Sequence, residues 1–99
     1  MMSAANLDFL GQLESVIQQR LRAGDDGSYT ARLAAAGDKR MAQKVGEEAV
    51  ELALATVSGD RTEQLDEAAD LVYHLLVLLN TRGLSLADVC AVLERRHAS

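Results

Sequence analysis

Residues 44–51 read KVGEEAVE, and residues 67–70, which follow after fifteen further positions, read EAAD. Residues three apart on an α-helix share one face, so Glu48 pairs with Glu51 and Glu67 pairs with Asp70. Two such helices that face each other bring four carboxylates together. Carboxylates, completed by water and substrate phosphate, are the usual ligands of Mg²⁺ in proteins. The pattern therefore predicts two neighbouring helices and a metal-dependent reaction on a phosphate compound.

The composition of the whole chain is also that of a helical protein. The 99 residues contain no proline, and 48% of them are hydrophobic although only 3% are aromatic. An aliphatic core without proline favours helices, and this length suits one domain, residues 1–99. Apolar spacing predicts helices that, with their caps, occupy about residues 6–24, 28–37, 38–57, 60–83 and 85–97, with a glycine-aspartate loop at residues 24–27. The short connections predict an all-α bundle of about four to five helices.

Polar residues at the helix starts predict where the helices begin. Asn6, Asp38, Asp60 and Ser85 are each placed to cap the helix that follows. Asp60 with Glu63, and Ser85 with Asp88, also have the three-residue spacing of a capping box. These caps define the boundaries of the predicted bundle.

The charge and the single cysteine limit the possible functions. A formal net charge of −5 and a sequence pI of about 4.8 argue against a nucleic-acid or anionic-membrane surface. The longest apolar run, residues 75–79, is too short to span a bilayer, and the first residues lack a signal-peptide pattern. Cys90 is the only cysteine, so no intrachain disulfide forms, and its apolar neighbours predict a small core residue. These features predict a cytoplasmic protein.

Apolar stripes flank the acidic residues on both predicted helices, which places the acids at the edge of a core or across a subunit junction. Two carboxylates about 5–6 Å apart repel each other by roughly 3 kcal/mol at an effective dielectric constant near 20. Lys44 and Arg40 can relieve part of this repulsion, whereas a divalent cation answers four converging acids more completely. The alternative is a charged surface stripe that makes ordinary salt bridges.

Basic residues and a histidine lie close to the acids in the sequence. Lys39, Arg40 and Lys44 can contact phosphate oxygens, with plain surface ion pairs as the alternative. His74 lies one turn beyond Asp70, so Asp70 can orient its imidazole or His74 can line the substrate cavity. The alternative for His74 is a half-buried histidine with a satisfied hydrogen bond.

Four segments together resemble the phosphoribosyl-ATP pyrophosphohydrolase family. They are GSYT at residues 27–30, KR at 39–40, KVGEEAVE at 44–51 and EAADLVYHLLVLL at 67–79. The likeness runs from about Leu7 to His97. The paired acids alone are similar to the wider group of MazG-type and dimeric dUTPase-type pyrophosphatases, whereas the first and last segments indicate this family.

The resemblance implies hydrolysis of phosphoribosyl-ATP to phosphoribosyl-AMP and pyrophosphate, the second step of histidine biosynthesis. It also implies a homodimer of helical chains with active sites near the subunit junction. In many organisms the family's domain is fused to the cyclohydrolase of the next step, and because these 99 residues have no room for it, we expect that enzyme to be a separate chain. In the mechanism that we expect, Mg²⁺ is held by Glu48, Glu51, Glu67 and Asp70. Glu47 is a further ligand or the base that orients the attacking water. The predicted catalytic residues are Glu47 and Glu48. The predicted substrate-binding residues are Lys39, Arg40, Lys44 and His74.

Two other functions are compatible with the same pattern. A MazG-type enzyme would hydrolyse an ordinary or modified nucleoside triphosphate. A helical dimerisation module would use the acids to bind a structural cation or a basic partner, without catalysis.

Overall fold

The computed structural model of the chain describes residues 6–24 and 27–98, and within these ranges it contains five helices and no strand. The prediction of an all-α fold of about four to five helices is therefore confirmed. Asp25 and Asp26 of the predicted loop lie outside the described residues. The helices are α1 (Phe9–Ala23), α2 (Tyr29–Ala36), α3 (Asp38–Ser58), α4 (Arg61–Thr81) and α5 (Leu86–His97).

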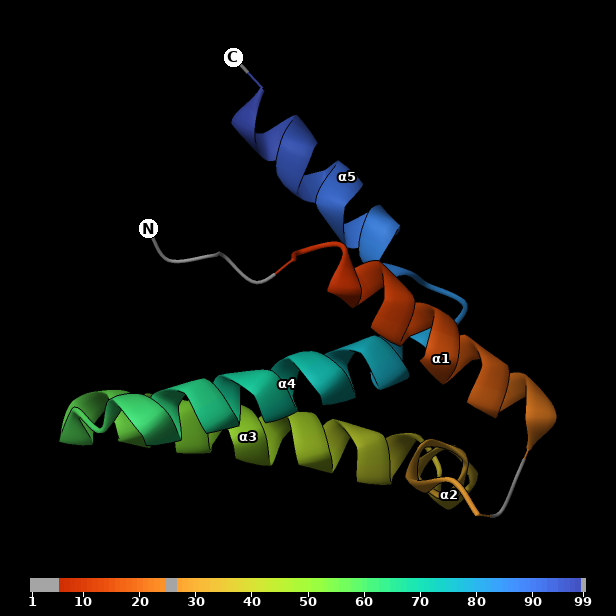
Figure 1. The fold of residues 1–99 in the computed structure, drawn as a ribbon, viewed down its shortest axis with the longest axis horizontal. Coiled ribbons are helices and arrows are strands. Elements are labelled where there is room, and N and C mark those ends of the chain that lie inside the picture. Colours follow the sequence, from red (N-terminus) through yellow and green to blue (C-terminus); the bar gives the residue numbers. More distant parts are fainter. Residues whose placement is uncertain (1–5, 25–26, 99) are drawn as a thin grey trace.

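The two longest helices, α3 and α4, form an antiparallel hairpin and lie side by side along their length (Figure 1). Gly59 ends α3 with φ +82°, a left-handed conformation that glycine adopts without steric cost. Asp60 then caps α4, because its side chain accepts a hydrogen bond from the Glu63 backbone N–H at 3.0 Å. This short turn fixes the register of the hairpin and so decides which residues of α3 and α4 face each other.

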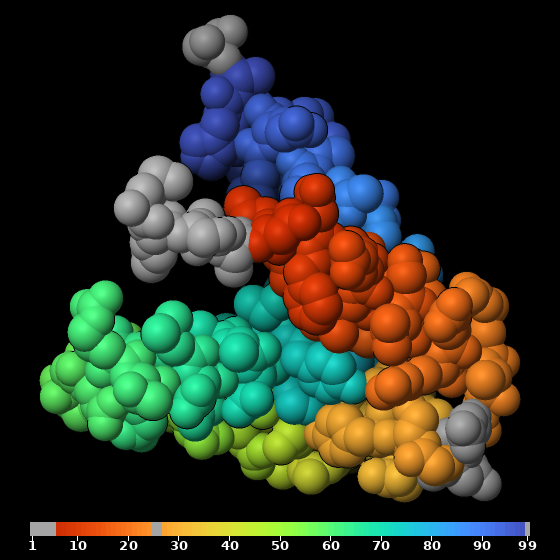
Figure 2. Space-filling view, viewed as in Figure 1, coloured from red at the N-terminus to blue at the C-terminus, as the bar shows by residue number. Residues whose placement is uncertain are grey.

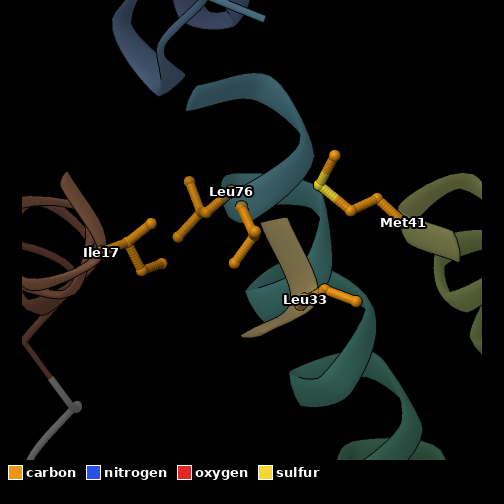
Figure 3. Packing of buried hydrophobic residues seen from close by; sticks show 5 residues of the cluster. Ile17, Leu33, Met41 and Leu76 are labelled. Atoms are coloured by element: carbon orange, nitrogen blue, oxygen red, sulfur yellow. The ribbon is translucent and has the colours of Figure 1, made fainter. Parts of the chain in front are cut away.

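Helices α1 and α2 pack against the end of the hairpin where α3 begins and α4 ends (Figure 1). Their contact with the hairpin forms the hydrophobic core, in which side chains from four helices meet (Figure 3). The fully or almost fully buried members of this core are Ile17, Leu33, Met41, Leu76 and Val77. The opposite end of the hairpin, around the Gly59 turn, extends beyond α1 and α2 (Figure 2).

Two of the predicted caps are wrong, and two are confirmed at least in part. Asp8 is the N-cap of α1, and the Asn6 side chain instead accepts a hydrogen bond from the Asp8 N–H at 2.8 Å. Asp38 is the first residue of α3, where a negative charge favours the helix N-terminus, and Gly37 takes the cap position. At α4 the Asp60 half of the capping box is present. At α5 the box between Ser85 and Asp88 is complete.

Helix α5 projects away from the hairpin and has no buried residue (Figure 1). Its start is attached to α1, because the Leu86 N–H donates to Glu14 Oε2 at 2.9 Å. Cys90 is exposed on this helix, so the prediction of a core cysteine is wrong. Of its apolar neighbours, Leu86 packs against the hydrophobic core, Val89 is half-buried and Leu93 is 47% exposed.

An apolar surface lies on α3, on the side away from α4, and consists of Val50, Leu54 and Val57. We call this surface the hairpin face. Its three side chains are between 59% and 86% exposed. Uncovered aliphatic side chains at this density are unusual on a monomeric protein and are typical of an interaction surface.

Over the described residues, no single helix has the length and hydropathy needed to cross a membrane. Helices α4 and α5 reach these limits only when they are taken together, and they are bent by 103° at their junction.

Candidate active site

The structure brings the four predicted metal ligands together across the hairpin. Glu48 and Glu51 lie one turn apart on α3, and Glu67 and Asp70 lie one turn apart on α4. Glu51, Asp70 and Glu48 are all close enough to Glu67 to act on it through their charges. We call these four residues the acid cluster.

The acid cluster changes the titration of Glu67, which is the less exposed of its two α4 residues. Partial burial raises the pKa of the Glu67 carboxyl above its usual value, and the negative charges of Glu51 and Asp70 raise this pKa further. The charge of Glu48 acts in the same direction. Mutual repulsion of this kind is what a bound cation would relieve.

Glu48 differs from the other three acids because it is buried, with 5% of its surface exposed. Its Oε1 atom accepts a hydrogen bond from His74 Nδ1 at 2.5 Å, and its Oε2 atom lies 3.9 Å from Lys44 Nζ. A buried carboxylate needs such partners, since an unpaired charge in a protein interior is strongly unfavourable. Glu48 is therefore held in one orientation by neighbours on both of its oxygens.

The donor atoms of the acid cluster fit a hard divalent cation, because carboxylate oxygens from two facing helices are the ligand type that such ions prefer. Nevertheless, no three acidic, histidine or cysteine side chains among the described residues already stand in the geometry of a metal site. Binding of a cation would require the side chains of Glu51, Glu67 and Asp70 to turn inward.

His74 is buried, with 7% of its surface exposed, and both of its ring nitrogens have protein partners. Nδ1 lies 2.5 Å from Glu48 Oε1 and 2.9 Å from the backbone carbonyl oxygen of Asp70. The Asp70 carboxylate, which the sequence suggested as the orienting group, is not the partner. Nε2 lies 2.8 Å from the Tyr29 hydroxyl. The direct contact of His74 with substrate stays a prediction.

The predicted basic residues lie at different distances from the acids along α3. Lys44 is one turn before Glu48 and close to it. Arg40 is a further turn away, about 12 Å from Glu48 along the helix axis. Lys39 is nine residues before Glu48, a rotation of about 180° on an ideal helix, and so points to the other side of α3. The structure thus brings Lys44 to the acid cluster of its own chain but not Lys39.

Glu47 points away from α4 and is exposed, with its Oε2 atom accepting a hydrogen bond from Gln43 Nε2 at 3.0 Å. It lines a wide surface depression of about 640 Å³ together with Gly46, Val50 and Glu51. The depression thus joins the predicted base, one acid of the cluster and one residue of the hairpin face. Another depression, of about 440 Å³, lies between α1 and the α4–α5 connection and contains none of the predicted site residues.

Tyr29 joins the site although the sequence did not predict it as a site residue. Tyr29 and Thr30, at the start of α2, contact two consecutive residues of α4: the Tyr29 hydroxyl bonds His74, and the Thr30 hydroxyl bonds the Tyr73 hydroxyl. Ser28 caps α2 by accepting a hydrogen bond from the Ala31 N–H, which fixes the orientation of the Tyr29 backbone. The GSYT segment was the available signal, although its spacing from His74 gave no indication of contact.

The raised pKa of Glu67 predicts a pH dependence of stability. A carboxyl with a raised pKa in the folded state favours folding less as pH rises from its usual value of 4.5 through the raised value. We therefore expect the Tm of the wild type to fall relative to that of a Glu67→Gln variant, both in EDTA, as pH rises across this range. Thermal melts from about pH 4 to pH 8 measure this difference. A constant difference would show that the acids do not interact.

Comparison with known proteins supports the assignment that the resemblance suggested. The profile of the phosphoribosyl-ATP pyrophosphohydrolase family matches residues 10–97. The histidine biosynthesis bifunctional protein HisIE of Photobacterium profundum is 57% identical over 91 residues, which are 92% of this chain and 44% of that protein. The phosphoribosyl-ATP pyrophosphatase of Pyrobaculum arsenaticum is 56% identical over 88 residues, which are 89% of this chain and 94% of that protein.

The chain therefore spans less than half of the bifunctional relative but nearly the whole of the shorter one. The matched region, residues 10–97, includes the acid cluster, Lys44, His74 and Tyr29. Since the family profile covers almost the entire sequence and every residue of the candidate site, the chain belongs to the phosphoribosyl-ATP pyrophosphohydrolase family.

Proposed function

We propose that the chain hydrolyses phosphoribosyl-ATP to phosphoribosyl-AMP and pyrophosphate, as a step of histidine biosynthesis in the cytoplasm. Family membership over residues 10–97 supports this substrate. The names of its relatives, a phosphoribosyl-ATP pyrophosphatase and a histidine biosynthesis protein, agree with it. The observation that carries the proposal is the acid cluster, in which the charges of Glu51, Asp70 and Glu48 all act on Glu67 across the hairpin.

In this proposal Glu48, Glu51, Glu67 and Asp70 hold Mg²⁺, which when bound would neutralise phosphate charge and acidify a water molecule. Glu47 orients the attacking water and accepts its proton, since it is exposed beside the cluster and, unlike Glu48, is not held by a buried partner. The water oxygen bonds to the α-phosphorus, and the bond from that phosphorus to the bridging α–β oxygen breaks, so pyrophosphate leaves. Glu48 is a ligand with a fixed orientation.

The basic residues bind the phosphate chain in the proposed mechanism. Lys44 is the best placed of them, one turn from the acids, and acts as a point charge on phosphate oxygens. Arg40 would reach the more distant phosphates as a donor fork. Lys39, on the opposite side of α3, can take part only at a junction where another chain's acids come near. Phosphoryl transfer depends mainly on such positioning and electrostatic stabilisation.

We infer that the functional unit is a homodimer formed through the hairpin face. The face is apolar and exposed, and it adjoins the depression that contains Glu47 and Glu51. A second copy placed there would cover aliphatic surface worth roughly 25 cal/mol per Å² of apolar area. It would also lie beside Glu51, the member of the acid cluster that lines the same depression.

Leu54, which is 64% exposed, provides the test of this dimer. A Leu54→Glu variant places a charge in the interface of both copies, so we expect a shift from dimer to monomer in sedimentation experiments and a loss of activity. Leu84→Glu is the control, because Leu84 is also an exposed leucine (48%) but lies in the α4–α5 connection. If the Leu54→Glu and Leu84→Glu variants had the same association state and the same activity, the hairpin face would be ruled out as the interface.

The proposed substrate is tested by measuring pyrophosphate release from phosphoribosyl-ATP and from a panel of nucleoside triphosphates. We expect a clear preference for phosphoribosyl-ATP, together with growth without histidine when the chain is supplied to cells that lack this hydrolase. Faster release from a triphosphate would indicate a MazG-type activity. If divalent ions raise only the thermal stability and no nucleotide is hydrolysed, the chain is a dimerisation module.

A further inference from the structure

A buried chain of hydrogen bonds connects three helices behind the acid cluster. It runs from the Tyr29 hydroxyl on α2, through His74 on α4, to the Glu48 carboxylate on α3, with distances of 2.8 Å and 2.5 Å. His74 and Glu48 are only 7% and 5% exposed. The sequence gives no indication of this connection, because Tyr29 and His74 are 45 positions apart.

The direction of the bonds follows from the partners of the imidazole. Both neighbours of Nδ1, the Glu48 carboxylate and the Asp70 carbonyl, are acceptors, so Nδ1 carries a proton and donates it. In the neutral ring, Nε2 then accepts the hydrogen bond of the Tyr29 hydroxyl. Each group thus fixes the next, and Glu48 is the last in the series.

The orientation of the imidazole is also fixed by packing. The Tyr29 and Tyr73 rings both meet it edge to face, with centroid distances of 5.7 Å and 5.2 Å and interplanar angles of 82° and 85°. Rotation of the ring about its Cβ–Cγ bond would break both hydrogen bonds and collide with one of the tyrosines. His74 is therefore a rigid donor that points at one oxygen of Glu48.

We propose that His74 is a positioning residue: it holds the Glu48 carboxylate in the orientation needed to bind a divalent cation, and Tyr29 holds the imidazole from the other side. This inference rests on the proposed cation-binding role of the acid cluster. It assigns His74 an indirect role in place of direct contact with substrate. With Oε1 occupied by the histidine, Oε2 is the oxygen that Glu48 offers to the cation.

Outer partners of this kind contribute strongly to metal sites, and their loss typically weakens metal affinity or activity by about 10–100-fold. Tyr29 extends the arrangement to the surface. It is 41% exposed and lines a depression of about 290 Å³ with Arg20, Gly27 and Ser28. The Glu48 carboxylate is consequently connected, through two side chains, to the GSYT segment at the molecular surface.

Two substitutions of His74 separate its two hydrogen bonds. In asparagine the side-chain nitrogen is two bonds from Cβ, as Nδ1 is in histidine, so His74→Asn keeps a donor to Glu48. In glutamine the nitrogen is three bonds from Cβ, as Nε2 is, so His74→Gln keeps a polar group near Tyr29 and loses the donor to Glu48. The two variants are similar in polarity, which makes each the control for the other.

The experiment measures the binding of Mg²⁺ and of Mn²⁺ to the substrate-free protein by titration calorimetry, with circular dichroism as the check on folding. We expect His74→Gln to weaken cation binding by about 10–100-fold, and His74→Asn to restore it to within a few-fold of the wild type. Tyr29→Phe should weaken binding in the same direction and by less. The Tyr29 variant also maintains the test if His74→Gln does not fold, because it removes one hydroxyl from a partly exposed residue.

Turnover separates this inference from the proposed reaction. At saturating Mg²⁺, the KM for phosphoribosyl-ATP should be unchanged in His74→Gln, whereas the Mg²⁺ concentration for half-maximal activity should rise by the same factor as the dissociation constant. A raised KM with unchanged cation binding would instead show direct contact with substrate and overturn the inference. Equal cation binding by the Asn and Gln variants, or no cation binding by the wild type, would also overturn it. If cation binding follows the expected order but phosphoribosyl-ATP is not hydrolysed, His74 keeps its positioning role and only the proposed reaction fails.

Discussion

Replacement of Glu51 by glutamine should lower kcat/KM for phosphoribosyl-ATP by about 10²–10³-fold and at the same time raise the Tm of the metal-free protein. The substitution keeps the size of the side chain but removes one charge from the acid cluster. Activity falls because a cation ligand is lost where phosphate charge must be neutralised. Stability rises because Glu67 no longer faces a second carboxylate, and the new amide can donate a hydrogen bond to it.

Addition of Mg²⁺ should stabilise the wild type more than the Glu51→Gln variant. A cation that binds only the folded wild type at 100 times its dissociation constant stabilises it by about 2.7 kcal/mol, whereas the Glu51→Gln variant should gain much less. Melting temperatures with EDTA and with Mg²⁺ measure both effects. The control is Glu94→Gln, which changes the net charge equally but lies exposed on α5. Near-normal turnover in Glu51→Gln would contradict its assignment, and a fall in Tm would contradict the repulsion.

Much of the acid cluster could be predicted because helical geometry alone determines it. The three-residue spacing gives each pair one face, and the short turn at residues 58–60 requires the two helices to be antiparallel neighbours. The sequence does not distinguish Glu48 from Glu51, which share that face. In the structure Glu48 is 5% exposed and bound to His74, while Glu51 is exposed and acts on Glu67 through its charge. This difference depends on contacts that periodicity does not describe.

The errors have the same origin. Periodicity finds an apolar stripe on a helix but does not say whether another element covers it. On α4 the stripe is covered by α1 and α2, so Leu76 and Val77 are fully buried. On α5 only its start is covered, where Leu86 packs against the core, and Cys90 is exposed. The contact between Tyr29 and His74 was unpredictable for a related reason: the path of α2 relative to α4 depends on the packing of the whole core.

Replacement of Leu76 by alanine should destabilise the protein by about 3 kcal/mol, which is the largest stability effect that we expect from one substitution. Leu76 is fully buried in the core where α1, α2 and α4 meet (Figure 3). The loss combines the transfer of the side chain with the cavity that it leaves, because such a core relaxes only partly. For a chain of this size, the corresponding decrease in Tm is roughly 10–25 °C.

Leu84→Ala is the matched control for Leu76→Ala, since Leu84 is 48% exposed and its truncation should cost well under 1 kcal/mol. Urea denaturation of both variants should be repeated at several protein concentrations, because association of copies would add to the apparent stability. A cost for Leu76→Ala no greater than that of the control would show that α1 and α2 close the cavity. Leu76 also lies two residues after His74 on α4, so loosened packing of α2 there should weaken the Tyr29–His74 contact. The core variant is therefore expected to bind Mg²⁺ less tightly than the wild type even where it remains folded, whereas Leu84→Ala should bind it equally well.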